Sequence, residues 1–259
     1  MSKEPSSGLA AERLEAIRQI LRRQRVVRVE ELRRALRVSG ATVRRDLRRL
    51  DREGRLRRVH GGAVAPEGSL EEPLFEDKTR QAARQKERIA QAALEEVRPN
   101  DSIFLDGGST VLALAQRLTG LTQLTVVTNS LRVAAAFAGE GPRMILSGGE
   151  FRRLSQTLVG PLSRPLLEQL RVDTAFIGTL GFSWRDGLTT TDPREAQTKA
   201  LAMARAERVA LLADGSKLGK VSFVRFGTLA DVDLVVTDRG APAAALRELR
   251  RNGVKVRVV

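Results

Sequence analysis

The feature that most constrains this chain is an arginine-rich segment at residues 39–63, SGATVRRDLRRLDREGRLRRVHGGA. Ser39 is a good helix N-cap, because its side-chain oxygen can accept a hydrogen bond from a free amide of the first turn. Apolar residues then recur at helical spacing, at Val43, Leu47 and Leu50. Gly54 is placed to end the helix, and residues 56–59 alternate like a short strand. The segment predicts a helix with one buried and one basic face, followed by a β-wing.

Two shorter helices are expected upstream of this one. Residues 29–36 form a helix with Leu32 and Leu36 on one face, and residues 14–21 supply the buried side of another. Three short helices followed by a wing predict a winged helix-turn-helix, in which the second helix of the pair enters the major groove of DNA.

The placement of charge separates DNA binding from the alternative of a solvated, arginine-rich helix. Residues 1–65 hold 18 Lys and Arg against 8 Asp and Glu, whereas the remaining 194 residues hold 27 against 23. A polyanionic partner of the N-terminal quarter explains this asymmetry, and double-stranded DNA is the expected one. The predicted DNA contacts are Ser39, Ala41, Thr42, Arg44, Arg45 and Arg48 on the helix, and Arg57, Arg58 and His60 on the wing.

Composition limits what the rest of the chain can do. The 259 residues include no cysteine and one histidine, His60, which excludes disulfides, thiolate metal sites and histidine-based triads. We therefore expect neither a metal nor a cofactor. No stretch resembles a signal peptide or a membrane span, so a soluble, cytoplasmic protein without a membrane partner is expected. The predicted domains are residues 1–63 and 76–259, joined by a linker at 64–75 that contains two prolines.

The larger part alternates short apolar strands with helices, which predicts an α/β domain with a mostly parallel sheet. One continuous helix is expected at 75–97, and another at 193–207 with Asp192 as its cap and Pro193 at its first position. The expected strands are 102–105, 124–127, 143–146, 174–177, 208–212, 234–236 and 254–258.

Three polar turns follow predicted strands, at 106–110, 128–130 and 214–217. Ligands of open α/β sheets bind at the carboxyl ends of strands, and a helix N-terminus favours an anion. Each turn also has a plainer interpretation: the first as a tight connection, the third as a local Asp-turn with a solvated lysine. Glu195 and Lys199 are one helical turn apart, so an ordinary ion pair is the default for them. Trp184 could pack a sugar face, but covering the core is the favoured interpretation.

The motifs together resemble those of the DeoR family of bacterial transcriptional repressors. Residues 38–47, VSGATVRRDL, match the family pattern V-S-x-x-T-[IV]-R-R-D-L, and residues 60–63 match its wing ending H-G-G-A. The polar turns, the Gly178 to Gly187 loop, Glu195 and Lys199 are similar to landmarks of the family's effector domain, which resembles ribose-5-phosphate isomerase.

The resemblance implies a sensor of phosphorylated sugars or related metabolites. It implies ligand contact for Asp214 and Lys217, suggests Lys78 and Lys86 (with Arg80 as an alternative to Lys78), and makes residues 106–110 the phosphate cradle. The predicted effector contacts are Lys78, Lys86, Asp106, Gly107, Gly108, Ser109, Thr110, Asn129, Glu195, Lys199, Asp214 and Lys217.

We therefore predict a transcriptional repressor of carbohydrate-metabolism genes whose DNA affinity is lowered by a phosphorylated sugar. A palindromic operator would require a homo-oligomer, a dimer or higher. The alternatives are a sugar-phosphate isomerase-like enzyme fused to a DNA-binding domain, with Asp106, Glu195 and Asp214 as candidate carboxylates, and a purely architectural DNA binder.

Overall fold

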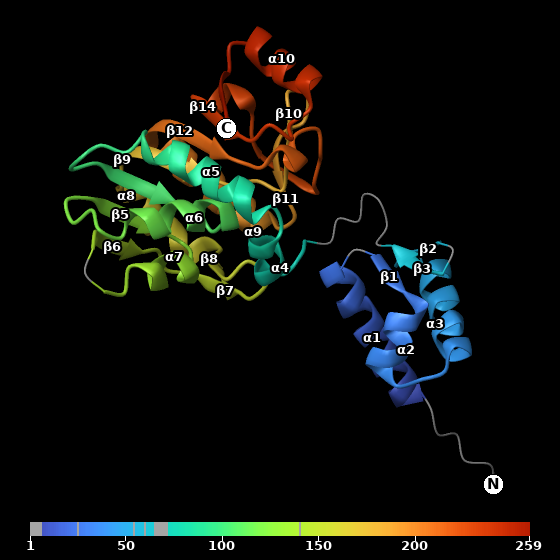
Figure 1. The fold of residues 1–259 in the computed structure, drawn as a ribbon. Coiled ribbons are helices and arrows are strands. Elements are labelled where there is room, and N and C mark those ends of the chain that lie inside the picture. The colour runs from blue at the N-terminus through green and yellow to red at the C-terminus, as the bar shows by residue number, and fades with distance from the viewer. Residues whose placement is uncertain (1–6, 25, 54, 60, 65–71, 140) are drawn as a thin grey trace. The chain divides into compact units, whose positions relative to one another are not determined.

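The computed structural model describes residues 7–24, 26–53, 55–59, 61–64, 72–139 and 141–259 (Figure 1). The chain divides into two compact units, Met1–Leu74 and Phe75–Val259, which are described separately below. No helix in the described part of the chain is both long and apolar enough to cross a bilayer. His60 and Gly54, and the linker residues 65–71, lie outside the described residues.

The N-terminal unit is a winged helix-turn-helix, as predicted. Its helices α1 (Ser7–Gln24), α2 (Val29–Leu36) and α3 (Gly40–Arg52) enclose a core that includes Ile17, Leu32 and Leu47. A three-stranded antiparallel sheet follows the order β1-β3-β2, with β1 (Val26–Arg28), β2 (Arg57–Val59) and β3 (Gly62–Val64). Strand β1 was not predicted, because three residues are too few to show a period.

The wing turn depends on two glycines. Gly61 has a φ of +78°, which glycine adopts without steric cost. A Cβ atom at Gly62 would lie 2.0 Å from the carbonyl oxygen of Val27, so β3 can approach β1 only if this residue has no side chain. The Gly61-Gly62 turn therefore holds the wing against the strand before α2.

A seven-stranded sheet forms the centre of the C-terminal unit, and every strand pairs in parallel with its neighbours. The order is β15-β14-β12-β9-β4-β5-β6, which confirms the predicted mostly parallel α/β fold. The strands are β4 (Ser102–Leu105), β5 (Thr125–Thr128), β6 (Arg143–Leu146), β9 (Val172–Ile177), β12 (Ala206–Leu212), β14 (Leu234–Thr237) and β15 (Lys255–Val258).

Helices cover both faces of this sheet (Figure 1). One face packs against α5 (Ala83–Leu94), α6 (Ser109–Leu118) and α7 (Leu131–Ala136), through a core that includes Ile89, Leu114 and Val133. The other face packs against α8 (Arg164–Gln169), α9 (Pro193–Ala204) and α10 (Ala243–Arg251), with Leu167, Ala202 and Leu249 in its core.

Two small antiparallel sheets were not predicted. One is the hairpin of β7 (Glu150–Arg152) and β8 (Thr157–Val159), and the other joins β10 (Gly181–Ser183), β11 (Gly187–Thr190) and β13 (Val224–Gly227). The predicted loop from Gly181 to Gly187 is therefore the turn of a hairpin. Trp184 lies in this turn with 37% of its surface exposed, and the exposure alone does not decide between covering the core and packing a sugar face.

The single helix predicted at 75–97 is also wrong. Helix α4 (Phe75–Arg80) ends before α5 begins, and Ala82 between them has φ +52° and ψ +36°, in the left-handed region. Neither glycine nor proline marks the break, so the sequence carried no local signal for it. Lys86 stabilises the end of α4 instead, because its ammonium group donates hydrogen bonds to the carbonyl oxygens of Lys78 and, at 2.6 Å, of Gln81.

Candidate functional site

The exposed face of α3 carries the predicted DNA-reading side chains. Ala41, Arg44, Arg45 and Arg48 are exposed, and Thr42 is half-buried. Ser39 caps the helix as predicted, since its Oγ accepts a hydrogen bond from the Thr42 amide at 3.2 Å. The side chains that the motif needs for contact with bases and phosphates therefore point to solvent, while the apolar stripe is buried.

A basic hollow lies between α3 and the wing. It is lined by Arg45, Arg48, Arg52 and Arg58, together with Asp51. The Asp51 carboxylate accepts a hydrogen bond from the Arg58 amide at 3.1 Å, which fixes β2 against the end of the helix. Four guanidinium groups around one hollow form an environment that attracts the phosphates of nucleic acid.

Asp46 of the R-R-D-L motif has a structural role that was not predicted from the sequence. Its buried carboxylate pairs with Arg13 of α1 at 2.6 Å. The pair joins α1 to α3, so it sets the orientation of the recognition helix within its unit. The signal for it was an acidic residue one position before Leu47 on the apolar side of a basic helix.

The candidate effector site begins at the point where the strand order of the large sheet reverses. The chain leads from β4 outward through β5 to β6, and then returns to β9 on the other side of β4. In open α/β sheets this switch point, at the carboxyl ends of the strands, is where ligands bind. Asp106 follows β4 and Gly178 follows β9, so both lie at this position.

A fully buried ion pair occupies the switch point. The Asp106 carboxylate pairs with the Lys199 ammonium group and accepts a hydrogen bond from the Gly178 amide at 2.9 Å. Lys199 also donates to the Gly178 carbonyl oxygen at 3.1 Å. The structure thus brings together two of the predicted site residues from positions 93 apart in the chain.

The glycines after Asp106 are explained by packing. A Cβ atom at Gly107 would lie 2.0 Å from the Cγ2 atom of Thr157, so the β7–β8 hairpin can lie here only over a glycine. Gly108 is the N-cap of α6, and Ser109 and Thr110 begin its first turn. The turn is therefore both a tight connection and a helix N-terminus whose free amides can bind an anion.

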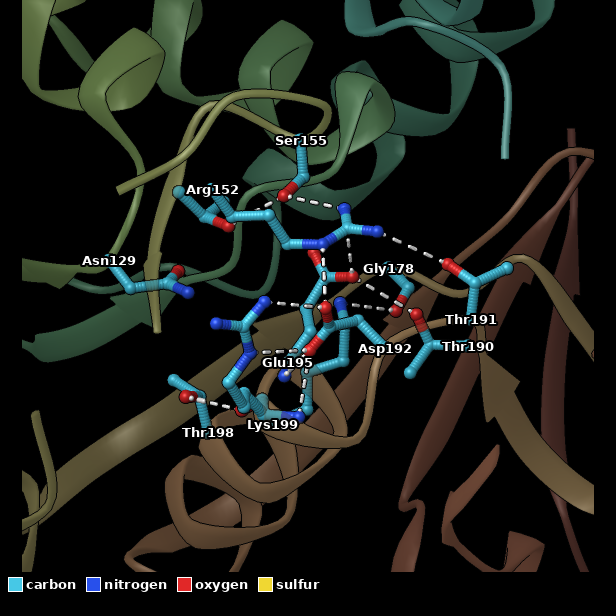
Figure 2. Close-up of polar contacts among 12 residues, drawn as sticks. Asn129, Arg152, Ser155, Gly178, Thr190, Thr191, Asp192, Glu195, Thr198 and Lys199 are labelled. Atoms are coloured by element: carbon cyan, nitrogen blue, oxygen red, sulfur yellow. Dashed lines mark hydrogen bonds and ion pairs between the residues drawn. The ribbon is translucent and has the colours of Figure 1, made fainter. Parts of the chain in front are cut away.

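The ion pairing of Lys199 differs from the helical default. Its carboxylate partner is Asp106, not a neighbour on α9, while Glu195 accepts a hydrogen bond from Thr190 Oγ1 at 3.1 Å and lies 3.7 Å from Arg152 (Figure 2). Both residues are 5% exposed, and each has a partner from another part of the fold: Asp106 after β4 for Lys199, and Thr190 of β11 for Glu195. Tertiary packing therefore determines their contacts more than their helical spacing does.

Arg152 on β7 has a side chain that is 11% exposed, and it was not predicted as a site residue, since one arginine among 38 gives no signal. Figure 2 shows its guanidinium group extended between Ser155 and Thr191, at 3.0 Å and 3.4 Å from their hydroxyl oxygens. It also donates a hydrogen bond to Asp192 at 3.1 Å.

Asp192 caps α9 as predicted, by accepting hydrogen bonds from the amides of Arg194 and Glu195 at 2.8 Å and 3.2 Å. Burial alone would raise the pKa of Asp192. Hydrogen bonds from the Arg194 side chain, from these two amides and from Arg152 outweigh burial and lower the pKa to about 2. The start of α9 therefore carries a permanent negative charge that holds Arg152.

A second group of predicted residues gathers around Lys86, which is 5% exposed. Burial lowers the pKa of Lys86 to about 8, the charge of Asp214 opposes this shift, and Lys217 and Lys78 add to it. The structure thus brings Asp214, Lys217 and Lys78 within electrostatic reach of Lys86. Asp214 also forms the local turn of the plainer interpretation, accepting a hydrogen bond from the Ser216 amide at 3.1 Å.

Comparisons with known proteins agree with the motifs. Residues 13–68 match the model of the DeoR-like helix-turn-helix domain, and residues 81–239 match that of the DeoR C terminal sensor domain. The HTH-type transcriptional regulator GlpR of Haloferax volcanii is 38% identical over 88% of this chain and 89% of its own length. The glycerol-3-phosphate regulon repressor of Escherichia coli is 32% identical over 95% of this chain and 97% of its own length.

Among solved structures, ribose 5-phosphate isomerase A of Methanocaldococcus jannaschii is 16% identical, with a TM-score of 0.39 over 52% of this chain and 54% of that chain. This likeness is too low to support an assignment, and the relatives above do not favour the enzyme alternative. The two family models cover the helix-turn-helix and the sensor domain in the order expected from the motifs. The chain belongs to the DeoR family, and it is a DNA-binding transcription regulator rather than an enzyme.

Proposed function

We propose that this protein is a repressor of carbohydrate-metabolism genes, and that a phosphorylated sugar or related metabolite bound by the C-terminal unit releases it from DNA. Relatives named as the glycerol-3-phosphate regulon repressor and the putative aga operon transcriptional repressor support the first part. The observation that carries the second part is the buried Lys86, which has Asp214, Lys217 and Lys78 within electrostatic reach.

Lys86 is 5% exposed and two further lysines lie within electrostatic reach of it, so positive charge gathers in a largely buried place. A phosphate group would balance that charge, and Asp214 could accept a hydrogen bond from a sugar hydroxyl. The N-terminus of α6 at Ser109 and Thr110 supplies free amides for the same anion. The proposed contacts of the effector's anionic end are therefore these lysines and the first turn of α6.

The test of this site uses Lys217→Ala and Asp214→Ala. Both residues lie in the turn after β12 and not in an apolar core, so both variants should fold. We expect each variant to bind the sugar phosphate at least about tenfold more weakly than the unmodified protein does. Tenfold in affinity corresponds to about 1.4 kcal/mol of binding free energy. Calorimetry that gives undiminished binding in both variants would remove this assignment.

On the DNA side, we propose that the exposed residues of α3 read bases and that the wing holds phosphates. The proposed base-reading residues, Thr42, Arg44 and Arg45, lie in the first half of α3, the part that meets base edges in this motif. Two half-sites of a palindromic operator would engage two copies of the chain, so the active form is proposed to be a dimer or a higher oligomer.

Arg45→Ala and Arg58→Ala should separate these two roles. Arg45→Ala should cost about 1–3 kcal/mol for operator DNA and less for random DNA, because a base contact is lost. Arg58→Ala should weaken both similarly and reduce the salt slope by about 1, because a phosphate contact is lost. Fluorescence anisotropy over a salt series measures both, and equal losses on the two DNAs for Arg45→Ala would exclude base reading by this residue.

A further inference from the structure

Several buried side-chain oxygens in the described part of the C-terminal unit have no hydrogen-bond partner, and three of them form a row. They are Asp106 Oδ1, Asn129 Oδ1 and Ser147 Oγ, on residues that are at most 1% exposed. Each residue directly follows one of three adjacent strands, β4, β5 and β6. An unpaired acceptor buried away from water costs free energy, so three in a row require an explanation.

The strand register places these three residues side by side. Leu105 pairs with Thr128, and Thr128 pairs with Leu146, so the residues that follow them are neighbours across the sheet. Adjacent strands are about 4.8 Å apart. The three residues therefore lie along one edge of the sheet, where a single molecule with several hydroxyl groups can reach all of them.

The chemistry of the row selects hydroxyl donors over anions. The second oxygen of Asp106 is held by Lys199 and Gly178, which leaves Oδ1 as an acceptor only. Asn129 donates through Nδ2 to the Leu158 carbonyl oxygen at 3.3 Å, so the oxygen of its amide is the unpaired atom. A carboxylate beside an amide oxygen repels phosphate and accepts hydrogen bonds from hydroxyl groups.

The β7–β8 hairpin closes this row from solvent. Leu158 donates its amide to the Asn129 carbonyl oxygen at 2.7 Å, and Leu131 donates its amide to the Gln156 carbonyl oxygen at 3.1 Å. Thr157 lies directly over Gly107. The hairpin forms a two-stranded sheet of its own, and a two-stranded ribbon has little stability without the surface that it covers.

Arg152 attaches this hairpin to the start of α9. Its contacts with Asp192 and Thr191, and its approach to Glu195, all cross from β7 to the segment around the α9 N-terminus (Figure 2). The side chain is 11% exposed, and its partner Asp192 is 14% exposed, so solvent screens this attachment only partly.

We propose that the β7–β8 hairpin is a lid, latched by Arg152, over a subsite in which Asp106, Asn129 and Ser147 bind the hydroxyl groups of a polyol. The subsite rests on the proposed function, because it receives the hydroxyl end of the same effector whose phosphate the lysines hold. The lid does not depend on that function, and it must open whenever a ligand enters or leaves.

Hydrogen exchange tests the lid without any ligand. The amides of Leu131 and Leu158 should exchange through local opening, faster than the amides of β4 and β5. Arg152→Ala should accelerate both about tenfold, with Arg152→Lys intermediate, because charge-assisted hydrogen bonds of the latch are lost. Arg171→Ala, which breaks an exposed ion pair with Glu207, is the control. Protection equal to that of β4 and β5, unchanged by Arg152→Ala, would overturn the lid.

Ser147→Ala tests the row, with Ser163→Ala as its matched control. Both serines are at most 2% exposed, but Ser163 donates its hydroxyl hydrogen to the Gly160 carbonyl oxygen at 2.7 Å. Ser147→Ala should leave the urea midpoint unchanged or higher and Ser163→Ala should lower it, because only the second variant loses a hydrogen bond. A lower midpoint for Ser147→Ala would show that its hydroxyl group is already satisfied and would overturn the subsite.

A reversible disulfide tests lid and subsite together. Ser130 and Thr157 are paired in an isolated antiparallel β-bridge. Its backbone hydrogen bonds are made by the neighbouring residues, so Ser130 and Thr157 form a non-hydrogen-bonded pair. The Cα atoms of such a pair are close enough for a disulfide. The chain contains no cysteine, so Ser130→Cys with Thr157→Cys gives one defined bond, and the reduced protein is its own control. The single-cysteine variants control for the loss of the Ser130 cap on α7.

The probes are ribose 5-phosphate, glucose 6-phosphate, sorbitol 6-phosphate and inorganic phosphate. A sugar phosphate should bind the reduced protein and associate at least about tenfold more slowly with the oxidised protein, while inorganic phosphate should not distinguish the two. Equal association rates of the sugar phosphate with both forms would overturn the lid. If neither the reduced nor the unmodified protein bound any of the probes, the proposed function and the subsite would both be contradicted. The hydrogen-exchange experiment would still test the lid, because it needs no ligand.

Discussion

Replacing Asp106 by asparagine should lower the free energy of unfolding of the C-terminal unit by about 3–5 kcal/mol, the cost of breaking a buried ion pair by removing one partner. Asparagine keeps the shape of the side chain but not its charge. The Lys199 ammonium group, 5% exposed, would then keep the Gly178 carbonyl oxygen and lose its carboxylate. Urea unfolding followed by fluorescence isolates this unit, because the only tryptophan is Trp184.

Two further variants test whether the expected loss of stability comes from the burial of the ion pair. Glu207→Gln breaks the pair with Arg171, whose side chains are 75% and 53% exposed, and should cost no more than about 1 kcal/mol. Asp106→Leu combined with Lys199→Met removes both charges and should recover much of the stability, since replacing a whole buried pair is often neutral. If Asp106→Asn were as mild as Glu207→Gln, the ion pair would not stabilise the switch point.

The parts of the fold that the sequence predicted well depend on neighbours in the chain. The Ser39 and Asp192 caps need only the amides two or three residues ahead, and strands such as 102–105 follow from short apolar runs. The recognition helix was predictable for the same reason, because its apolar stripe and its arginines lie within one segment. The family motifs then gave the order of the two domains.

The contacts that the sequence could not predict join distant segments. Lys199 is one helical turn from Glu195, so spacing alone favoured that pair, yet the sheet places Asp106 beside the lysine. The sequence does not distinguish Arg152 from the other arginines, and only the folded hairpin places it beside Asp192. The break at Ala82 has no glycine or proline, because the Lys86 side chain stabilises the end of α4 from outside the local sequence.

Lys86→Met should give a repressor that binds its operator normally and no longer responds to the effector. Methionine has a similar length and lacks the charge, so the phosphate loses a buried cationic partner, whereas α3 and the wing belong to the other unit and are unchanged. Release of operator DNA by the sugar phosphate, followed by anisotropy, should disappear. The circular dichroism of the variant controls for folding, and a response as large as that of the unmodified protein would exclude Lys86 from the effector site.

The pH dependence of effector binding gives an independent check on Lys86. Burial lowers its pKa to about 8, and a bound phosphate favours the ammonium form and therefore raises that pKa in the complex. Above pH 8 the free protein loses this proton and the complex retains it, so effector affinity should fall by up to about tenfold per pH unit as the pH rises. Calorimetry between pH 7 and 9.5 measures this, and Lys86→Met should remove the fall.

We propose that Lys86 also couples effector binding to the DNA-binding unit. Lys86 donates hydrogen bonds to the carbonyl oxygens of Lys78 and Gln81 at the end of α4, the first helix after the linker. A phosphate bound to its ammonium group would compete with these carbonyl oxygens, and we expect it to change the end of that helix. Suppose that the effector binds tenfold more tightly to the protein conformation that has the lower DNA affinity. The coupling free energy between the two sites is then about 1.4 kcal/mol, and saturating operator DNA must weaken effector binding by the same factor of ten. Identical effector affinities with and without operator would mean that the two units act independently. A weaker affinity with operator, abolished by Lys86→Met, would assign the coupling to this lysine.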